Sequence, residues 1–268
     1  IDYIVRGEAE KSFCNLLRSY KDDKIINFEQ LEQNLDNLDF PDRKLLYTYP
    51  ENLNNPIKNV MTSRGCQYSC PYCFNSIYRS FYKGQKWVRH RSPENVIAEC
   101  EELKKYNTKF IFFQDDEFLS NPKLFKLLNL YKENIKLPFH CQIRIELLTD
   151  ERAALLRQSG CTGVTFAIEC GNPAIRKLIL KRDMSDRQIL EGVRILHRHG
   201  LKFRTENMLG LPNESLKSMF KTVELNSKCK PTIAWASIFQ PYPKLKISEG
   251  IKVDREYKYS FFEDTVMD

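Results

Sequence analysis

The amino-acid sequence predicts an α/β domain with a parallel sheet, and three observations support this prediction. Six short apolar or β-branched runs follow one another, helical patterns lie between them, and several helix starts place a capping residue before a proline. Strands that alternate with helices form parallel sheets whose strands are buried on both faces. The pattern fits a full barrel, a partial barrel or a doubly wound sheet equally well. The predicted strands are residues 57–62, 110–114, 139–145, 164–168, 203–208 and 233–239.

The segment ahead of these strands is shorter and less regular. Residues 3–5 predict a short strand, Gly7 a turn, and Phe13, Leu16 and Leu17 one apolar face of a helix. Residues 21–56 are rich in Asn and Asp and show no sustained period, so we expect a connector with at most short elements.

Four helical patterns lie between the predicted strands, and several have punctuated ends. The apolar faces are Val96, Ile97, Cys100 and Leu103; Leu124, Leu127, Leu128 and Tyr131; Ile189, Val193 and Leu196; and Leu216, Met219, Phe220 and Val223. Ser92, Asn121 and Asn172 precede prolines and predict helix starts, Ser185 with Gln188 predicts a capping box, and Gly200 predicts a helix end.

Composition sets further limits. The chain has 268 residues, of which 42% are hydrophobic and 29% charged, which is typical of a globular domain with a sizeable core. No run of about 18 apolar residues occurs, so we expect no membrane-spanning helix. Nine cysteines, an odd number at irregular spacing, argue against a disulfide scaffold and favour a reducing, cytoplasmic location. The net charge of +7 is most simply explained by a solvated surface.

The residues that predict chemistry are concentrated in a loop just after the first strand of the main domain. Cys66, Cys70 and Cys73 place three thiols within eight residues, where they can converge on one centre. Thiolates suit iron–sulfur clusters and zinc, but structural zinc needs a fourth ligand, for which His90 is the candidate. Three ligands alone leave one coordination position open, which a catalytic centre requires.

The spacing Cys-x-x-x-Cys-x-aromatic-Cys resembles the signature of the radical S-adenosylmethionine (radical SAM) enzymes. The resemblance implies a partial (β/α)6 barrel in which Cys66, Cys70 and Cys73 hold a [4Fe–4S] cluster. It implies that the amino and carboxylate groups of S-adenosylmethionine bind the fourth iron and that Tyr72 lies against the adenine. An external one-electron donor such as flavodoxin or ferredoxin then reduces the cluster.

The ends of the other strands supply further candidates, because active sites in such barrels gather there. Asp115, Asp116 and Glu117 follow the second strand, and the resemblance implies that one of them contacts the cofactor ammonium. The family's Gly-Gly-Glu glycines are absent here, so the sequence leaves open which acid does so.

Four more cofactor contacts are predicted. Arg144 alternates with apolar residues on the third strand, which is costly for an inward arginine unless it is paired. Glu169 lies in a segment similar to the family's Gly-Ile-Glu-Ser-Gly, with Ala and Cys replacing Gly and Ser. Arg182 offers a planar fork for the cofactor carboxylate, and Gly210 lies in a turn similar to the family's Gly-Leu-Pro.

Shorter segments resemble the subgroup whose radical domain follows a flavodoxin-like cobalamin-binding domain. They are residues 2–10, 38–43, 63–66, 88–94, 115–118 and 241–243. On this resemblance residues 1–20 are the end of a cobalamin-binding domain, 21–56 a linker, 57–240 the radical SAM core, and 241–268 the start of a C-terminal region. Cobalamin would be bound mainly upstream, and the implied activity is methylation, or a related modification, of an unactivated carbon.

Two alternatives remain at this stage. A methylthiotransferase-like enzyme acting on transfer RNA would use Arg79, Lys83, Lys86, Arg89, His90 and Arg91 as a phosphate-binding surface. A non-catalytic iron–sulfur or zinc module would use the cysteines for structure or electron transfer. We expect a small-molecule or lipid-like substrate and no nucleic acid, because a solvated loop explains the basic run.

Overall fold

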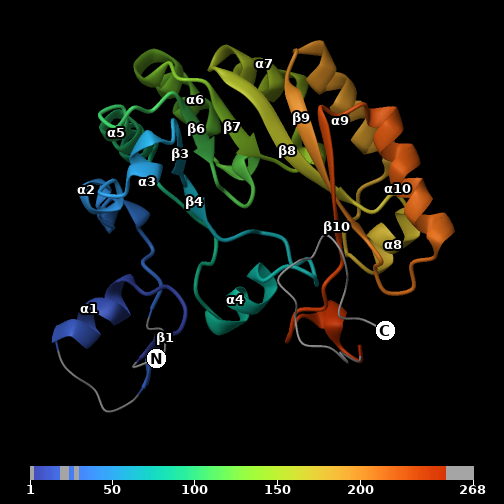
Figure 1. Cartoon of the computed structure of the whole chain (residues 1–268), viewed down its shortest axis with the longest axis horizontal. Helices are drawn as coiled ribbons and strands as arrows, with labels where there is room; N and C mark the ends of the chain where they lie inside the picture. Colours follow the sequence, from blue (N-terminus) through green and yellow to red (C-terminus); the bar gives the residue numbers. More distant parts are fainter. Residues whose placement is uncertain (1–2, 19–23, 27–29, 252–268) are drawn as a thin grey trace.

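The computed structural model describes residues 3–18, 24–26 and 30–251, and its centre is an open parallel sheet (Figure 1). The six strands pair in the order β10-β9-β8-β7-β6-β3, so each strand lies beside the next one of the domain, and β3 and β10 are not paired with each other. The architecture is a partial barrel, as predicted. Its strands are β3 (Ile57–Val60), β6 (Phe110–Phe113), β7 (Phe139–Gln142), β8 (Cys161–Glu169), β9 (Lys202–Leu209) and β10 (Ile233–Ile238).

Helices cover the outer face of this sheet (Figure 1). They are α5 (Pro93–Leu103), α6 (Leu124–Leu130), which continues into a π-helical turn over Tyr131–Ile135, α7 (Asp150–Gln158), α8 (Pro173–Leu178), α9 (Asp186–Arg198) and α10 (Leu216–Cys229). The predicted caps at Ser92 and Asn172, the capping box at Ser185, and the helix end at Gly200 are confirmed. Asn121 instead caps a turn, because its side chain accepts from the Lys123 amide and α6 begins only at Leu124.

The main core lies between the sheet and these helices. Strand residues that point outward, such as Ile111, Phe113, Phe139 and Val164, are fully buried there. Their neighbours along each strand point to the concave inner face, as the two-residue period of a strand requires. This pleat leaves polar side chains inside the open barrel, where the site described below is formed.

The apolar face predicted for α10 is wrong. Leu216, Phe220 and Val223 are 69%, 56% and 58% exposed, and the opposite face of the helix packs on the sheet. Hydrogen bonds fix this orientation: the Gly171 amide donates to the Thr222 hydroxyl at 2.8 Å. On the same face the Asn226 amide donates to the side chain of Asn207 at 2.9 Å and accepts from Thr205 at 2.6 Å.

A small unit precedes the barrel. β1 (Ile4–Val5) and β2 (Ile25–Ile26) pair in parallel, and α1 (Glu10–Arg18) lies between them in the chain. Of its predicted apolar face only Leu16 is buried, whereas Phe13 and Leu17 are exposed. β2 lies inside the segment predicted as a connector, which otherwise holds the short elements η1 (Leu35–Asn37), α2 (Arg43–Leu46) and α3 (Pro50–Asn54).

The cysteine loop lies after β3 and runs from one short strand to a short helix. β4 (Ser63–Arg64) pairs antiparallel with β5 (Arg89–His90), and α4 (Asn75–Phe81) follows the last cysteine. Residues 252–268, which hold most of the predicted C-terminal region, lie outside the described residues. No helix in the described part of the chain is long and apolar enough to span a lipid bilayer.

Candidate active site

Two features anchor the start of the cysteine loop. Gly65 has a φ of +84°, and a Cβ there would lie 2.5 Å from the backbone oxygen of Trp87, so the position requires glycine. Asp115, which is fully buried, accepts hydrogen bonds from the Thr62 amide at 3.1 Å, from the Thr62 hydroxyl at 2.8 Å and from the Ser63 hydroxyl. The loop therefore leaves β3 in one defined direction, toward the inside of the barrel.

The three cysteines line one cavity of about 200 Å³ at the carboxyl ends of the strands. Sixteen residues line it, and eight of them are candidates predicted from the sequence. These are Cys66, Cys70, Cys73, Tyr72, Asp116, Arg144, Glu169 and Arg182. Asp115, Glu117 and Gly210, which were also predicted as cofactor contacts, are not among the lining residues.

The thiol set fits a multi-iron cluster better than a single ion. All three thiols are free; Cys70 is buried, and Cys66 and Cys73 are half-buried. Within the described ranges, no three His, Cys, Asp or Glu side chains are placed to hold a single metal ion. His90 pairs with Ser63 across β4 and β5 and does not line the cavity. A [4Fe–4S] cluster places each thiolate on a different iron, which this loop can satisfy.

Burial sets the protonation of these thiols. It raises the pKa of Cys66 to about 11 and also raises the pKa of Cys73. Both are therefore neutral at physiological pH in the metal-free chain. Because iron binds the thiolate, assembly of a cluster here would release protons.

Arg144 is paired, as an inward arginine requires. Its Nε donates to Glu146 Oε1 at 2.6 Å, and its guanidinium lies 3.7 Å from the centre of the Tyr68 ring. Its Nη1 also lies 3.9 Å from Cys70 Sγ. The arginine is thus paired and at the same time places a positive charge beside one of the three thiols.

Three predicted residues interlock at the end of β8. The Tyr72 hydroxyl donates to Glu169 Oε1 at 2.9 Å, and Arg182 Nη1 donates to the Tyr72 oxygen at 3.2 Å. Arg182 Nη2 donates to the Ala167 carbonyl at 2.8 Å, while its buried Nε has no partner among the described residues. Burial raises the pKa of Glu169 despite the nearby Arg182 charge.

Glu169 also has unusual backbone geometry. Its φ is +65°, in the left-handed region that non-glycine residues rarely adopt, and the β8–β9 register shifts between Ala167 and Glu169. Such strain is concentrated at functional sites, where the surrounding structure holds it in place. Here it accompanies a carboxyl group that lines the cavity.

The acids after β6 have three different surroundings. Asp116 lines the cavity, where burial raises its pKa although the Asn75 side chain hydrogen-bonds to it. Glu117 accepts from the Leu119 amide at 2.8 Å and so caps η2 (Phe118–Ser120). Asp115 anchors the cysteine loop, as described above. Of the three acids, only Asp116 lines the cavity.

The last predicted contact, Gly210, lies in the turn after β9. Its φ is +76°, and its amide donates to Glu214 Oε2 at 3.0 Å. The turn packs beside the small apolar cluster that includes Leu211 and Phe239, which Tyr72 also contacts.

Five further polar residues of the cavity wall are not among the candidates predicted from the sequence. They are Tyr68, Asn75, Gln142, Thr165 and Glu206. Gln142, Thr165 and Glu206 occupy inward positions of three predicted strands, so the strand pleat was the available signal. Tyr68 and Asn75 lie in the cysteine segment itself and could have been included with it.

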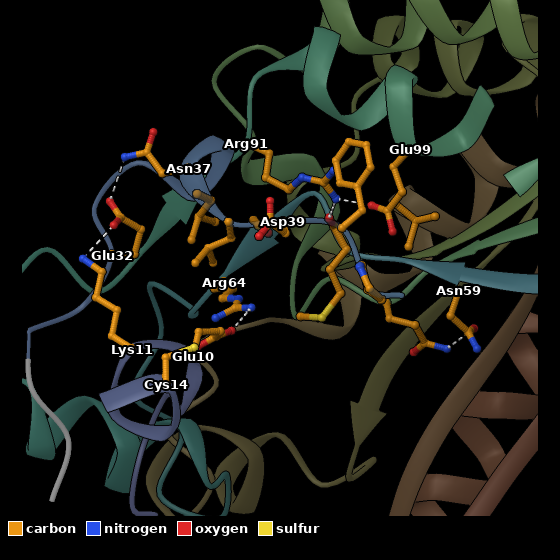
Figure 2. Close-up of a pocket in the computed structure, with 18 of the residues that line it drawn as sticks. Glu10, Lys11, Cys14, Glu32, Asn37, Asp39, Asn59, Arg64, Arg91 and Glu99 are labelled. Carbon is orange, nitrogen blue, oxygen red and sulfur yellow. Dashed lines mark hydrogen bonds and ion pairs between the residues drawn. The ribbon is translucent and has the colours of Figure 1, made fainter. Parts of the chain in front are cut away.

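A larger cavity of about 910 Å³ lies between α1, the connector and the β3–β4 edge of the barrel (Figure 2). A row of side-chain amides links it to the cysteine cavity. Gln114 Nε2 donates to Asn59 Oδ1 at 3.0 Å, and Gln142 Nε2 donates to Gln114 Oε1 at 3.3 Å. Asn59 and Gln114 line the large cavity and Gln142 lines the small one.

A partial parallel barrel with three thiols on the loop after its first strand defines a class of proteins with a catalytic centre at the barrel mouth. The family model of the radical SAM superfamily matches residues 60–225, so the chain belongs to that superfamily. The predicted resemblance is confirmed. Membership implies S-adenosylmethionine and a [4Fe–4S] cluster as cofactors, and the cysteine cavity fits that implication.

Relatives extend the comparison. The chain is 29% identical over 270 residues to an uncharacterized methyltransferase of Pyrococcus horikoshii, covering 93% of this chain and 58% of that protein. It is 25% identical to an anaerobic magnesium-protoporphyrin IX monomethyl ester cyclase of Rubrivivax gelatinosus, covering 97% and 52% respectively. The chain thus spans about half the length of the curated relatives it matches.

The fold is also that of solved radical SAM structures. The methyltransferase TsrM of Kitasatospora setae, with cobalamin and a [4Fe–4S] cluster bound, gives a TM-score of 0.60 at 20% identity, covering 68% of this chain and 36% of that one. The cobalamin-dependent enzyme OxsB, with aqua-cobalamin and S-adenosylmethionine bound, gives 0.60 at 16% identity, covering 75% and 30%.

Proposed function

We propose that this chain is the catalytic core of a cobalamin-dependent radical SAM enzyme that methylates, or otherwise modifies, an unactivated carbon of a small molecule. The observation that carries the proposal is the meeting of three thiols with the Tyr72–Glu169–Arg182 group in one cavity. A thiol-lined cavity that served only structure would need neither the strained Glu169 nor the unpartnered Arg182 Nε.

The residues divide into ligands of the cluster and contacts to S-adenosylmethionine. Cys66, Cys70 and Cys73 would each bind one iron. A reduced cluster supplies the electron that cleaves S-adenosylmethionine to methionine and a 5′-deoxyadenosyl radical. Arg182 would bind the cofactor carboxylate, because its Nε is free to donate.

Two acids and the tyrosine complete the proposed cofactor site. Glu169, at the carboxyl end of β8, and Asp116, after the carboxyl end of β6, both line the cavity. They would accept hydrogen bonds from the cofactor ammonium or ribose. Tyr72 would form the wall beside the adenine. Of these three residues Glu169 is buried and Tyr72 half-buried, so both would help to exclude water from a radical that reacts with most C–H bonds.

The larger cavity supports the cobalamin part of the proposal. We infer that a segment ahead of residue 1 holds most of the cobalamin and that the cavity of about 910 Å³ receives the rest. The parallel β1–α1–β2 unit on one wall of this cavity is the type of connection found in flavodoxin-like domains. The TsrM and OxsB structures, which share this fold, contain cobalamin, and this supports a cobalamin-dependent activity for the present chain.

The inner barrel face favours a small polar substrate over a lipid-like one. The amide row of Asn59, Gln114 and Gln142 runs between the two cavities, where a substrate would have to lie. Asn59 and Gln114 are exposed and Gln142 is half-buried, so a polar substrate there would gain hydrogen bonds from amides that an apolar one could not use. The transfer-RNA alternative has no such support, because Arg89 and Arg91 of the basic run are held by Glu8 and Glu99.

Anaerobic reconstitution with iron and sulfide tests the proposal. Wild-type protein supplied with dithionite and S-adenosylmethionine should form 5′-deoxyadenosine, and the Cys73→Ala variant should form none. Cys229→Ala, which removes a buried thiol that lines neither cavity, is the matched control and should behave as wild type. Wild-type protein that binds about one zinc per chain and forms no 5′-deoxyadenosine would refute the proposal.

A second measurement addresses cobalamin. The full-length protein should copurify with, or bind, hydroxocobalamin, detected by its visible absorbance. Met61→Trp, which narrows the large cavity, should weaken that binding, whereas Met219→Trp on α10 should not. Equal binding by all three proteins would remove the large cavity from the cobalamin site.

A further inference from the structure

The surface formed by α4 and the turn after it differs from the rest of the domain. Phe74 and Tyr78 are 59% and 39% exposed, and their rings contact edge to face with centroids 5.7 Å apart. Figure 1 shows α4 apart from the helices that cover the sheet. Exposed aromatic rings on a soluble domain are typical of interaction surfaces.

Three cations surround these rings. Arg79 lies on α4, and Lys83 and Lys86 lie in the turn that follows, all three exposed. None of them forms an ion pair with another residue in the described part of the chain. Arg79 Nη1 instead donates to the Ser69 hydroxyl of the cysteine loop at 3.2 Å. The surface, which we call the α4 patch, is therefore positively charged and not neutralised locally.

The α4 patch adjoins the thiols directly. Phe74 follows Cys73 in the chain, and the Cys73 carbonyl accepts from the Ser76 amide and hydroxyl in the first turn of α4. Cys66 and Cys73 are half-buried, whereas Cys70 is buried, so two of the three thiols are less shielded from solvent than the third. The hydrogen bond from Arg79 to Ser69 also places one cation of the patch against the cysteine loop.

We propose that the α4 patch is the docking surface for a small, acidic one-electron donor protein that reduces the cluster. This inference rests on the proposed function, since a cluster that cleaves S-adenosylmethionine must be reduced from outside. Three unpaired cations complement an acidic partner and accelerate its encounter, and the two rings provide apolar contact at the centre. The donor is oxidised by one electron and the cluster is reduced by one, with no atom transferred.

A nucleic-acid partner fits the patch less well. The basic run of the sequence extends from Arg79 to Arg91, but Arg89 is fully buried against Glu8 and Arg91 is paired with Glu99. Three cations remain, where a phosphate-binding surface commonly uses six or more. An electron donor must bind close to the cluster, and the α4 patch lies beside the thiols. Binding of a phosphate backbone does not require that position.

The test compares two reductants in three proteins. The double variant Lys83→Glu/Lys86→Glu alters the patch, and Lys217→Glu/Lys221→Glu makes the same charge change on α10, outside the patch. Cluster reduction by purified, photoreduced flavodoxin is followed by the loss of cluster absorbance in stopped flow. Dithionite, which needs no docking surface, serves as the second reductant.

We expect the patch variant to slow reduction by flavodoxin about tenfold or more at low salt and to lose its salt dependence. Reduction by dithionite should be equal in all three proteins, and the α10 variant should match wild type with both reductants. An unchanged flavodoxin rate in the patch variant, or an equal loss in the α10 variant, would overturn the proposal. A patch variant that loses binding of total transfer RNA but keeps its flavodoxin rate would assign the surface to nucleic acid.

This design separates the inference from the function on which it rests. If wild-type protein fails to form 5′-deoxyadenosine with dithionite, the proposed function fails. Binding of oxidised flavodoxin, measured by fluorescence titration, still decides the docking surface in that case. Weaker binding in the patch variant alone supports it, and equal binding in all three proteins refutes it.

Discussion

The ends of β6 and β8 both carry acidic residues at the barrel mouth, but they use them differently. After β6 three consecutive acids point in three directions, and only Asp116 lines the cysteine cavity. After β8 a single acid, Glu169, is fixed by Tyr72, by nearby Arg182 and by a left-handed backbone. The end of β6 thus anchors the loop that carries the thiols, and the end of β8 forms part of the cavity wall.

This difference shows that burial of a carboxyl group does not by itself indicate catalysis. Asp115 and Glu169 are both buried, and burial raises the pKa of each. The partners separate their roles, because Asp115 accepts from Thr62 and Ser63 of the loop anchor. Glu169 accepts a hydrogen bond from Tyr72 and lies near Arg182, and both of these residues also line the cavity.

The largest expected effect concerns the thiols toward which both strand ends project. Cys70→Ala should remove one iron ligand and reduce 5′-deoxyadenosine formation by at least about a thousandfold, because the cluster needs all three thiolates. Iron content and product are measured on the same reconstituted sample. Cys229→Ala, a buried thiol outside the cavity, should keep both at wild-type levels. A Cys70→Ala variant that retains activity would contradict the ligand assignment.

The next effect tests the wall at β8. Glu169→Gln should keep the hydrogen bond from Tyr72 but lose the negative charge. S-adenosylmethionine affinity should fall about 10- to 100-fold, the range for a lost charged hydrogen bond. The free energy of unfolding should change by less than about 1 kcal/mol, because the cost of burying a charge is lost as well. Equilibrium dialysis measures the affinity and urea unfolding measures the stability. A large loss of stability with unchanged affinity would contradict the assignment of Glu169 to cofactor binding.

Asp115→Asn is the matched change at β6, and it should act mainly on stability. The new amide would face the Thr62 N–H, so we expect a loss of about 2 kcal/mol in the free energy of unfolding. Affinity for S-adenosylmethionine in the folded, reconstituted fraction should change less than in Glu169→Gln. Wild-type stability in this variant would show that the loop anchor lies elsewhere.

A smaller effect is expected at Arg144, which lies between the two strand ends. Arg144→Gln removes a positive charge near Cys70 and should lower the cluster reduction potential by about 60 mV, the one-electron equivalent of about 1.4 kcal/mol. Glu146→Gln removes its negative partner and should shift the potential the other way. A redox titration followed by electron paramagnetic resonance gives both values, and shifts of the same sign would exclude an electrostatic cause.

Much of this fold follows from local pattern. The six runs became the six strands, because short β-branched segments between capped helices have few other ways to be buried. The orientation of α10 did not follow, because Thr222 and Asn226 pair with polar groups of the sheet while Leu216 and Phe220 remain exposed. A hydrophobic period cannot reveal a helix that is oriented by hydrogen bonds.

The candidate site shows the same limit. The cysteine spacing predicted the three thiols of the cavity, because contiguous loop residues stay together in any fold. Which of Asp115, Asp116 and Glu117 lines the cavity depends on the pleat of β6 and on the partners in β3. Those partners, Thr62 and Ser63, are more than fifty residues away in the chain, and local pattern carries no information about them.

The central claim is that one cavity holds both a cluster and S-adenosylmethionine, and electron paramagnetic resonance of the reduced, reconstituted protein tests it directly. The account predicts roughly four irons per chain and a reduced-cluster signal that changes when S-adenosylmethionine is added. The change should be weaker at equal cofactor concentration in Glu169→Gln. A four-iron signal that S-adenosylmethionine leaves unaltered in the wild-type protein would contradict the claim.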